Sequence, residues 1–333
     1  MIEVAEEGPS RTRIYADDPS ADIGEKPPAY GSGQPAADLH DLKPGQNRHS
    51  EALPKLVSTA RLSPKTLPSA MVLRMARPRM KCQDAALAAT NPETPMIDLY
   101  AMGSPNVVKI YIALEEMGLP YTVHPVDVFG EAQFSPEFLR LNPNAKVPVI
   151  VDRKAAGGQP YTVFESGAIL VYLADKTGRF LAKDGAARYD ALQWMMVQMT
   201  TVGPMFGQYV HFMRFAPKGN DYSLNRYRTQ VRRVLEVLEA RLAAIPFLGG
   251  QGYSIADIAT FPWARNVGTF LGKGAEGDYP KLMGWVAGIA ARPAVVRALA
   301  AVDDVRTKVT QFEQANTDAK DRLFGRGKHT AAA

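Results

Sequence analysis

The segment Met96-Ile-Asp-Leu-Tyr-Ala-Met-Gly-Ser-Pro-Asn-Val-Val-Lys109 decides the fold. It predicts a strand over residues 96–100, a tight loop, and a helix that begins at Pro105. Proline loses no hydrogen bond at the first helical position, and Ser104 before it can cap the first turn. Apolar side chains then recur at helical spacing up to Met117, and Gly118 can end the helix in the left-handed conformation. The free N–H groups at such a helix start favour an anion, a thiolate included.

The composition indicates a globular protein of up to two domains. The chain has 333 residues, of which 46% are hydrophobic and 22% charged. Its net charge of +5 includes no basic block dense enough to indicate nucleic acid, and no run reaches the ~18–20 apolar residues of a membrane span. The one cysteine, Cys82, excludes an intrachain disulfide and a cysteine metal cluster. We therefore expect no metal, no nucleic acid, no membrane and a reducing, cytoplasmic location.

Residues 1–95 differ from the rest of the chain. They hold 12 of the 25 prolines and show no sustained periodicity, so we predict a disordered extension. Residues 55–81 carry seven basic side chains and no acidic one. This favours a solvated tail over a transit peptide, which would lie at the N-terminus. The natural chain start is an open question, because Met71, Met80 or Met96 could each open a shorter protein.

Two domains follow the extension. In residues 96–180 the pattern predicts further strands at 121–128, 146–152 and 161–164, a short helix from Ser135-Pro136, and a helix over 168–176. This order is that of a thioredoxin-like α/β domain. Residues 188–302 read as all helical, with helices over 188–202, 224–242, 279–291 and 293–302 and a further helix that Ser254-x-x-Asp257 caps. Residues 303–333 are predicted to be a loosely held polar tail.

Several short motifs follow one another through these domains. They are Leu-Tyr-x-x-x-Ser-Pro-Asn-x-x-Lys (99–109), Gln-Phe-Ser-Pro-Glu-Phe-Leu (133–139), Asn-Pro-Asn-Ala-Lys-Val-Pro (142–148), Phe-Glu-Ser-Gly-Ala-Ile-Leu (164–170), Leu-Gln-Trp (192–194), Gly-Pro-Met-x-Gly-Gln (203–208) and Tyr-Ser-Ile-Ala-Asp-Ile-Ala (253–259). Together they resemble the cytosolic glutathione transferases, and most closely the nu class, the bacterial glutathione-dependent disulfide-bond oxidoreductases. The resemblance covers about residues 96–300.

The resemblance implies a thioredoxin-like domain, a helical transferase C-terminal domain, and glutathione as co-substrate for the reduction of a small disulfide. It also implies a homodimer. The thiolate that attacks the disulfide would come from bound glutathione, held by Asn106 and Ser104. The expected binding residues are Val147 before a cis Pro148, which pairs with the ligand backbone; Glu165, for its amino group; Ser166, for its γ-glutamyl carboxylate; and Lys146 and Gln133, at its glycine end or along its peptide.

Alternatives stay open at this stage. Tyr100 is a rival thiolate donor, since several transferase classes use a tyrosine at a strand end, although it also fits a core position. The strings around Ser104, Pro148 and Ser166 also fit plain turns, a strand start and a helix cap. Glutathione conjugation to small electrophiles is the alternative activity, and a non-catalytic regulator with the same fold is a third possibility. A second substrate site is expected at Gln208, Tyr209, His211 and Arg226, while Cys82 is taken as incidental.

Overall fold

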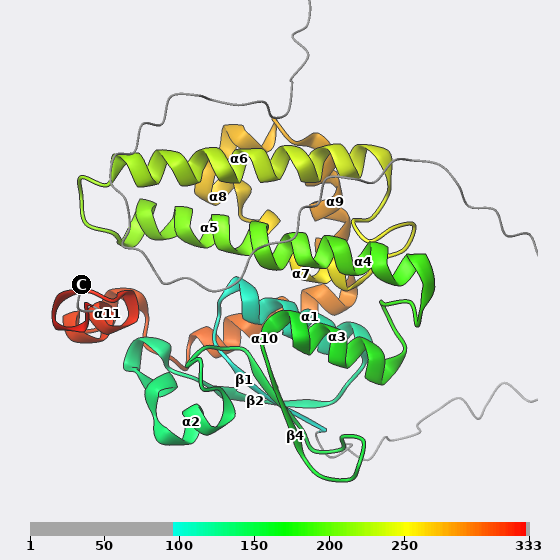
Figure 1. Cartoon of the computed structure of the whole chain (residues 1–333), viewed down its shortest axis with the longest axis horizontal. Coiled ribbons are helices and arrows are strands. Elements are labelled where there is room, and N and C mark those ends of the chain that lie inside the picture. The colour runs from blue at the N-terminus through cyan, green and yellow to red at the C-terminus, as the bar shows by residue number, and fades with distance from the viewer. Residues whose placement is uncertain (1–95, 331–333) are drawn as a thin grey trace, which may run out of the picture. The chain divides into compact units, whose positions relative to one another are not determined.

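The computed structural model describes residues 96–330, so the predictions about the extension, the internal starts and Cys82 lie outside the described residues. A four-stranded sheet forms the first domain, in the order β2-β1-β3-β4 (Figure 1). β1 runs parallel to β2 and antiparallel to β3, and β3 and β4 form a hairpin. The predicted thioredoxin-like topology is confirmed. The strands are β1 (Ile97–Ala101), β2 (Tyr121–Pro125), β3 (Val149–Asp152) and β4 (Tyr161–Phe164).

Helices cover both faces of this sheet. α1 (Pro105–Met117) and α3 (Ser166–Thr177) lie side by side on one face, where α1 is buried nearly all round because α7 and α10 also pack against it (Figure 1). α2 (Pro136–Leu141) closes the other face over a small apolar cluster that contains Phe138 and Val149. Both long helices end at left-handed glycines, Gly118 and Gly178, as predicted.

Two local predictions in this domain differ from the structure. The strand predicted over 121–128 ends at Pro125, and the chain turns there into a 3-10 turn over Val128–Gly130 that Asp127 caps. The Ser104 hydroxyl makes no capping hydrogen bond; the Ser104 carbonyl accepts from Val107 and Val108 instead. The preset φ of Pro105 is therefore enough to begin α1 without a side-chain cap.

The second domain is helical, as predicted. The predicted helix over 188–202 starts earlier, as α4, and continues through a π-helical turn, η3 (Gln198–Val202), into α5 and a second π-helical turn, η4 (His211–Phe215). Ser254 and Asp257 form the expected capping box. The helices are α4 (Gly185–Val197), α5 (Gly203–Val210), α6 (Asp221–Ala244), α7 (Ile255–Ala264), α8 (Val267–Leu271), α9 (Pro280–Ala290) and α10 (Pro293–Arg306).

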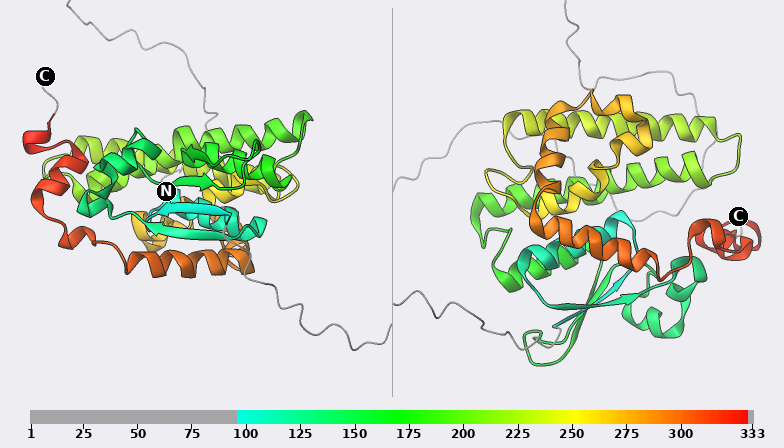
Figure 2. Two further views of the ribbon diagram at one scale, coloured as in Figure 1. Left: turned by 90° about the horizontal axis from the view of Figure 1, so that it is seen from below. Right: turned by 180° about the vertical axis from the view of Figure 1, so that it is seen from behind.

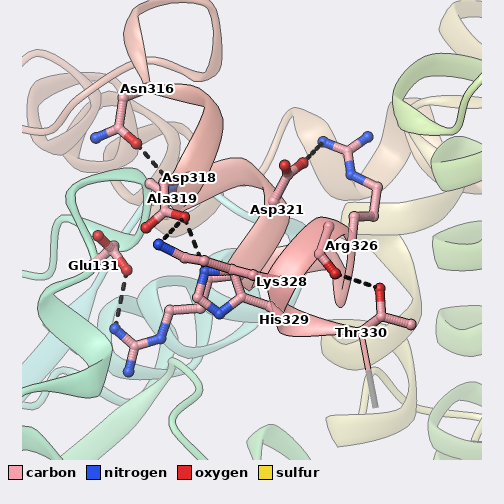
Figure 3. Close-up of polar contacts among 11 residues, drawn as sticks. Glu131, Asn316, Asp318, Ala319, Asp321, Arg326, Lys328, His329 and Thr330 are labelled. Carbon is pink, nitrogen blue, oxygen red and sulfur yellow. Dashed lines mark hydrogen bonds and ion pairs between the residues drawn. The ribbon is translucent and has the colours of Figure 1, made fainter. Parts of the chain in front are cut away.

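The expected polar tail is ordered over its described part. α10 runs to Arg306 instead of residue 302, and α11 (Thr317–Phe324) follows at one edge of the described structure, beside the 3-10 turn Val128–Gly130 (Figure 2). Phe312 and Phe324 pack against Phe215 of η4. Figure 3 shows the polar contacts of this segment, among them the cap that Asn316 provides for α11. These few aromatic contacts hold the segment against η4, although its composition is polar and most of its residues stay exposed.

Within residues 96–330 no single helix is long and apolar enough to cross a bilayer. Only α9 and α10 together reach that length and composition, with a bend of 81° between them.

Candidate functional site

One small pocket collects most of the residues that the sequence singled out. It lies where α1 and α3 begin, against the loop that leads into β3. Six of the eight predicted site residues line it, and Asn142 joins them. The lining residues are Asn106, Asn142, Lys146, Val147, Pro148, Glu165 and Ser166.

The start of α1 presents Asn106 to this pocket. Asn106 is exposed, and its Oδ1 accepts a hydrogen bond from Trp263 Nε1 of α7 at 3.2 Å. Since an indole N–H can only donate, this contact determines which end of the amide is the oxygen. The amide N–H₂ of Asn106 is then free to donate to a ligand. Trp263 thus sets the orientation of Asn106 from the helical domain.

The loop before β3 forms the second wall. The Val147–Pro148 peptide bond is cis, as the resemblance implied. Asn142 is buried and holds the loop: its Nδ2 donates to the Lys146 carbonyl at 2.6 Å, and its Oδ1 accepts from the Asn144 N–H at 2.9 Å. In the described part of the chain, Val147 makes no backbone hydrogen bond. Its N–H and C=O can therefore pair with an extended peptide.

The start of α3 forms the third wall. Glu165 has a φ of +67°, a left-handed conformation that is costly for a residue with a side chain and persists mainly at functional sites. Its carboxylate accepts from Asn144 Nδ2 at 3.2 Å. Ser166 opens the helix and is buried. Ile169 is the first residue of α3 whose N–H donates to a backbone carbonyl, that of Glu165. The preceding N–H groups of this twelve-residue helix can hold an anion.

A buried lysine lies directly behind Ser166. Lys109 of α1 is 1% exposed, and its Nζ donates to Gln198 Oε1 at 2.7 Å and to Ser166 Oγ at 3.3 Å. Burial lowers the pKa of Lys109 to about 7, against the opposing effect of the Glu165 charge. No role follows for Lys109 from the sequence alone. The sequence does show a lysine between apolar residues, and the structure adds that this helix is enclosed on several sides.

Other predicted residues lie outside this pocket. Ser104 is half-buried beside it, and Gln133 is 1% exposed with neither side-chain polar atom bonded within the described chain. Tyr100, the rival thiolate donor, stacks on His124 at 4.9 Å and meets Phe138 beneath α2. The structure therefore places Asn106, and not Tyr100, at the mouth of the pocket.

The four residues expected to form a second substrate site do not share one pocket. Tyr209 is buried, and its hydroxyl donates to the Phe270 carbonyl at 3.1 Å. His211 packs against Phe324 of α11. Gln208 is exposed on α5, and Arg226 lies in a shallow depression along α6. Tyr209 points away from Gln208 and His211 because positions one or two residues apart along a helix lie on different faces, and Arg226 lies on another helix.

The chain matches the model of the glutathione S-transferase N-terminal domain over residues 103–176 and that of the C-terminal domain over residues 195–293. It is 46% identical over 206 residues to the disulfide-bond oxidoreductase YfcG of Escherichia coli, a match that spans 61% of this chain and 94% of YfcG. The disulfide-bond oxidoreductase YghU of the same organism is 36% identical over 214 residues, which are 60% of this chain and 73% of YghU.

Two solved structures extend the comparison. A glutathione transferase family member from Pseudomonas fluorescens, with two glutathione molecules bound, superposes with a TM-score of 0.59 at 45% identity and covers 64% of this chain and 95% of that one. A glutathione transferase from Pseudomonas putida, with one glutathione disulfide bound per subunit, superposes with a TM-score of 0.58 at 42% identity and covers 62% of this chain and 92% of that one.

Proposed function

The chain belongs to the glutathione transferase family, and we propose that it is a glutathione-dependent disulfide-bond oxidoreductase that uses the thiolate of bound glutathione. One observation carries the proposal: the pocket combines a free amide donor, a free backbone pair and a helix N-terminus, but residues 96–330 contain no cysteine. We infer that the reactive sulfur comes with the ligand. The relatives named above act on disulfide bonds or bind glutathione and its disulfide.

Each part of glutathione has a proposed partner. Val147 pairs with the cysteinyl backbone, Glu165 binds the γ-glutamyl amino group, and Ser166 with the start of α3 binds the γ-glutamyl carboxylate. Lys146 contacts the glycine end. Gln133 lies outside the pocket, so its contact with the glycine end stays a prediction from the sequence. The resemblance to the family implies these placements, and the donors and acceptors that line the pocket support them.

In this arrangement the thiol of the bound glutathione lies at the start of α1. The Asn106 amide donates to the sulfur, the Ser104 hydroxyl is the second donor, and the N-terminus of α1 adds a partial positive charge. All three favour the thiolate over the thiol and so raise the fraction of nucleophile at neutral pH.

The reaction then balances in two exchanges. The bound glutathione thiolate attacks one sulfur of a disulfide substrate, forms a mixed disulfide and releases the other half as a thiolate, which takes up a proton. A second glutathione thiolate attacks the mixed disulfide at the glutathione sulfur. This yields glutathione disulfide and the second substrate thiol. The protein itself is neither oxidised nor reduced.

The test compares two acceptors on the purified full chain. Reduction of hydroxyethyl disulfide is followed through glutathione reductase and NADPH, and conjugation is followed with an aromatic electrophile such as chlorodinitrobenzene. We expect disulfide reduction to dominate and Asn106→Ala to lower its kcat/KM by about 10- to 100-fold, the scale of losing a hydrogen bond to a charged sulfur. Dominant conjugation would overturn the reductase assignment, and no turnover with either acceptor would favour a non-catalytic role.

We also propose that the protein is a homodimer and works in the cytoplasm. Large apolar side chains are exposed on β4, at Tyr161 and Phe164, and on α4, at Tyr189 and Met196. Such side chains support an interface with a second copy. Light scattering after size-exclusion chromatography measures the mass; a monomer at micromolar concentration would contradict the dimer.

A further inference from the structure

Lys109 is a charged group in an unusual place. It lies inside a helix that is packed between the sheet and the helical domain, and its side chain is 1% exposed. Its Nζ contacts Gln198 Oε1 at 2.7 Å, Ser166 Oγ at 3.3 Å and Met199 Sδ at 3.9 Å. None of these three partners carries a charge. A buried ammonium without a carboxylate partner is costly, so the position calls for an explanation.

The surrounding charges are engaged elsewhere. Glu165, at the start of α3, is the one that acts on Lys109, but its carboxylate is exposed and bonded to Asn144. On α7, Asp257 accepts from Leu248, Ser254 and Trp285. The charged side chains of α10 are paired as well. Arg292 pairs with Glu116 and Arg297 pairs with Glu115, both of which lie on α1. At the end of α10, Arg306 pairs with Asp303 and Lys308 pairs with Asp304.

The contact with Ser166 indicates where the missing negative charge belongs. Lys109 donates to Ser166 Oγ from the interior, and Ser166 lines the pocket from the other side. The hydroxyl oxygen accepts from Lys109, and its hydrogen points to Met199 Sδ at 3.8 Å, a weak acceptor that a carboxylate in the pocket would replace. An anion at the start of α3 would then lie one hydroxyl away from the ammonium, in a region of low dielectric where charges interact strongly.

We propose that Lys109 is a specificity-determining residue: it supplies the counter-charge for the γ-glutamyl α-carboxylate of glutathione and acts on it through Ser166. This rests on the proposed function, which puts that carboxylate at Ser166. Lys109 is a positioning residue and not a catalytic one, because it reaches the ligand through another side chain. Gln198 holds the ammonium from η3 of the helical domain, so both domains contribute to the recognition of this carboxylate.

A proton balance follows from this role. With a pKa of about 7, Lys109 is mostly neutral at pH 8 in the free protein. A bound carboxylate favours the charged form, so the pKa rises and the protein takes up close to one proton per ligand at pH 8. At pH 6 the ammonium is already charged, and the uptake disappears. Affinity for the carboxylate should therefore fall as the pH rises above 7.

The experiment uses two thioether ligands, so that no thiol ionises. One is S-methylglutathione, and the other is its analogue without the γ-glutamyl α-carboxylate. Isothermal titration calorimetry in buffers of different ionisation enthalpy gives the affinity and the proton uptake for the full-length wild-type chain. The variants are Lys109→Met, which removes the charge at similar volume, and Lys176→Met as control. Lys176 pairs with Asp152 at the far end of α3 and does not line the pocket.

We expect Lys109→Met to weaken S-methylglutathione binding at pH 6 by at least about 30-fold and the analogue by less than about 3-fold, the scale of removing one member of a buried charge pair. Lys176→Met should match the wild type. Equal loss for both ligands, or no loss, overturns the role of Lys109. The wild-type titrations test it without any variant: equal affinity for S-methylglutathione and for its carboxylate-free analogue at pH 6 also overturns it. Failure of the wild type to bind S-methylglutathione overturns the proposed function itself.

Discussion

Replacing Asn106 should raise the thiol pKa of bound glutathione, and the structure sets the size of the effect. The Asn106 amide is exposed at the second position of α1, and its oxygen is held by Trp263, so its N–H₂ is the donor that faces a ligand sulfur. A hydrogen bond to a charged acceptor contributes about 1.5–3 kcal/mol. Since one pKa unit corresponds to about 1.36 kcal/mol, Asn106→Ala should raise the thiol pKa by about 1–2 units.

Trp263 allows a graded version of this test. Trp263→Phe leaves Asn106 in place but removes the donor that orients its amide. The loss is that of an ordinary hydrogen bond, about 0.5–1.5 kcal/mol, so the thiol pKa should rise by about 1 unit or less. Tyr100→Phe serves as the control, because Tyr100 stacks on His124 beneath α2 and does not line the pocket.

The assay follows the ultraviolet absorbance of the thiolate in the enzyme–glutathione complex as a function of pH. The expected order of the pKa increase is Asn106→Ala, then Trp263→Phe, then Tyr100→Phe with none. Thermal unfolding of each variant shows whether the fold is intact, and alanine at this helical position should leave it so. The reasoning is refuted if Tyr100→Phe raises the thiol pKa more than Asn106→Ala does.

Three further predictions concern stability. Asp257→Ala should lower the free energy of unfolding by about 3 kcal/mol in urea titrations, because the fully buried carboxylate accepts four hydrogen bonds whose donors would lose their partner; a change under 1 kcal/mol would contradict this. Burial would raise the pKa of Asp98, but hydrogen bonds from Arg153 and His124 hold that pKa below its usual value. The ionised carboxylate therefore stabilises the fold at a pH above its unfolded-state pKa. This contribution is lost as the pH falls through the folded-state pKa. Asp98→Asn should therefore be about 1 kcal/mol less stable than the wild type at pH 7 and equal to it in acid, and a gap independent of pH would refute this. Phe312→Ala should speed limited tryptic cleavage of the C-terminal segment without loss of the core domains, and unchanged cleavage would show that the aromatic contacts do not hold it.

Most of the first domain could be predicted from the sequence because strong local signals mark its boundaries. Pro105 and Gly118 bracket α1, and β3 starts directly after Pro148. The resemblance to the family, and not local chemistry, supplied the predicted site residues; six of them meet in one pocket, at helix and strand starts. Much of this fold, and the position of this pocket within it, therefore follows from the proline and glycine residues that begin and end the helices and strands.

The rest depends on contacts between distant residues. Trp263 and Asn106 are 157 positions apart, and Lys109 and Gln198 are 89 apart, so neither pair leaves a local pattern. The apolar stripe of α1 also suggested one buried face, whereas packing against α3, α7 and α10 buries Lys109 as well. The order of the C-terminal segment was missed because isolated aromatics such as Phe312 have no periodicity.

The π-helical turn η3 lets this part of the chain carry an extra residue without changing which side chains face the first domain. A π turn accommodates one residue more than an α turn in nearly the same rotation, so deleting a single residue there would restore a regular helix and keep the orientation of α5. The same deletion inside α4 would instead rotate Gln198 and everything beyond it by about 100° around the helix axis, the angle of one residue step, and would turn Gln198 away from Lys109. A single-residue deletion in η3 should thus be tolerated far better than one in α4.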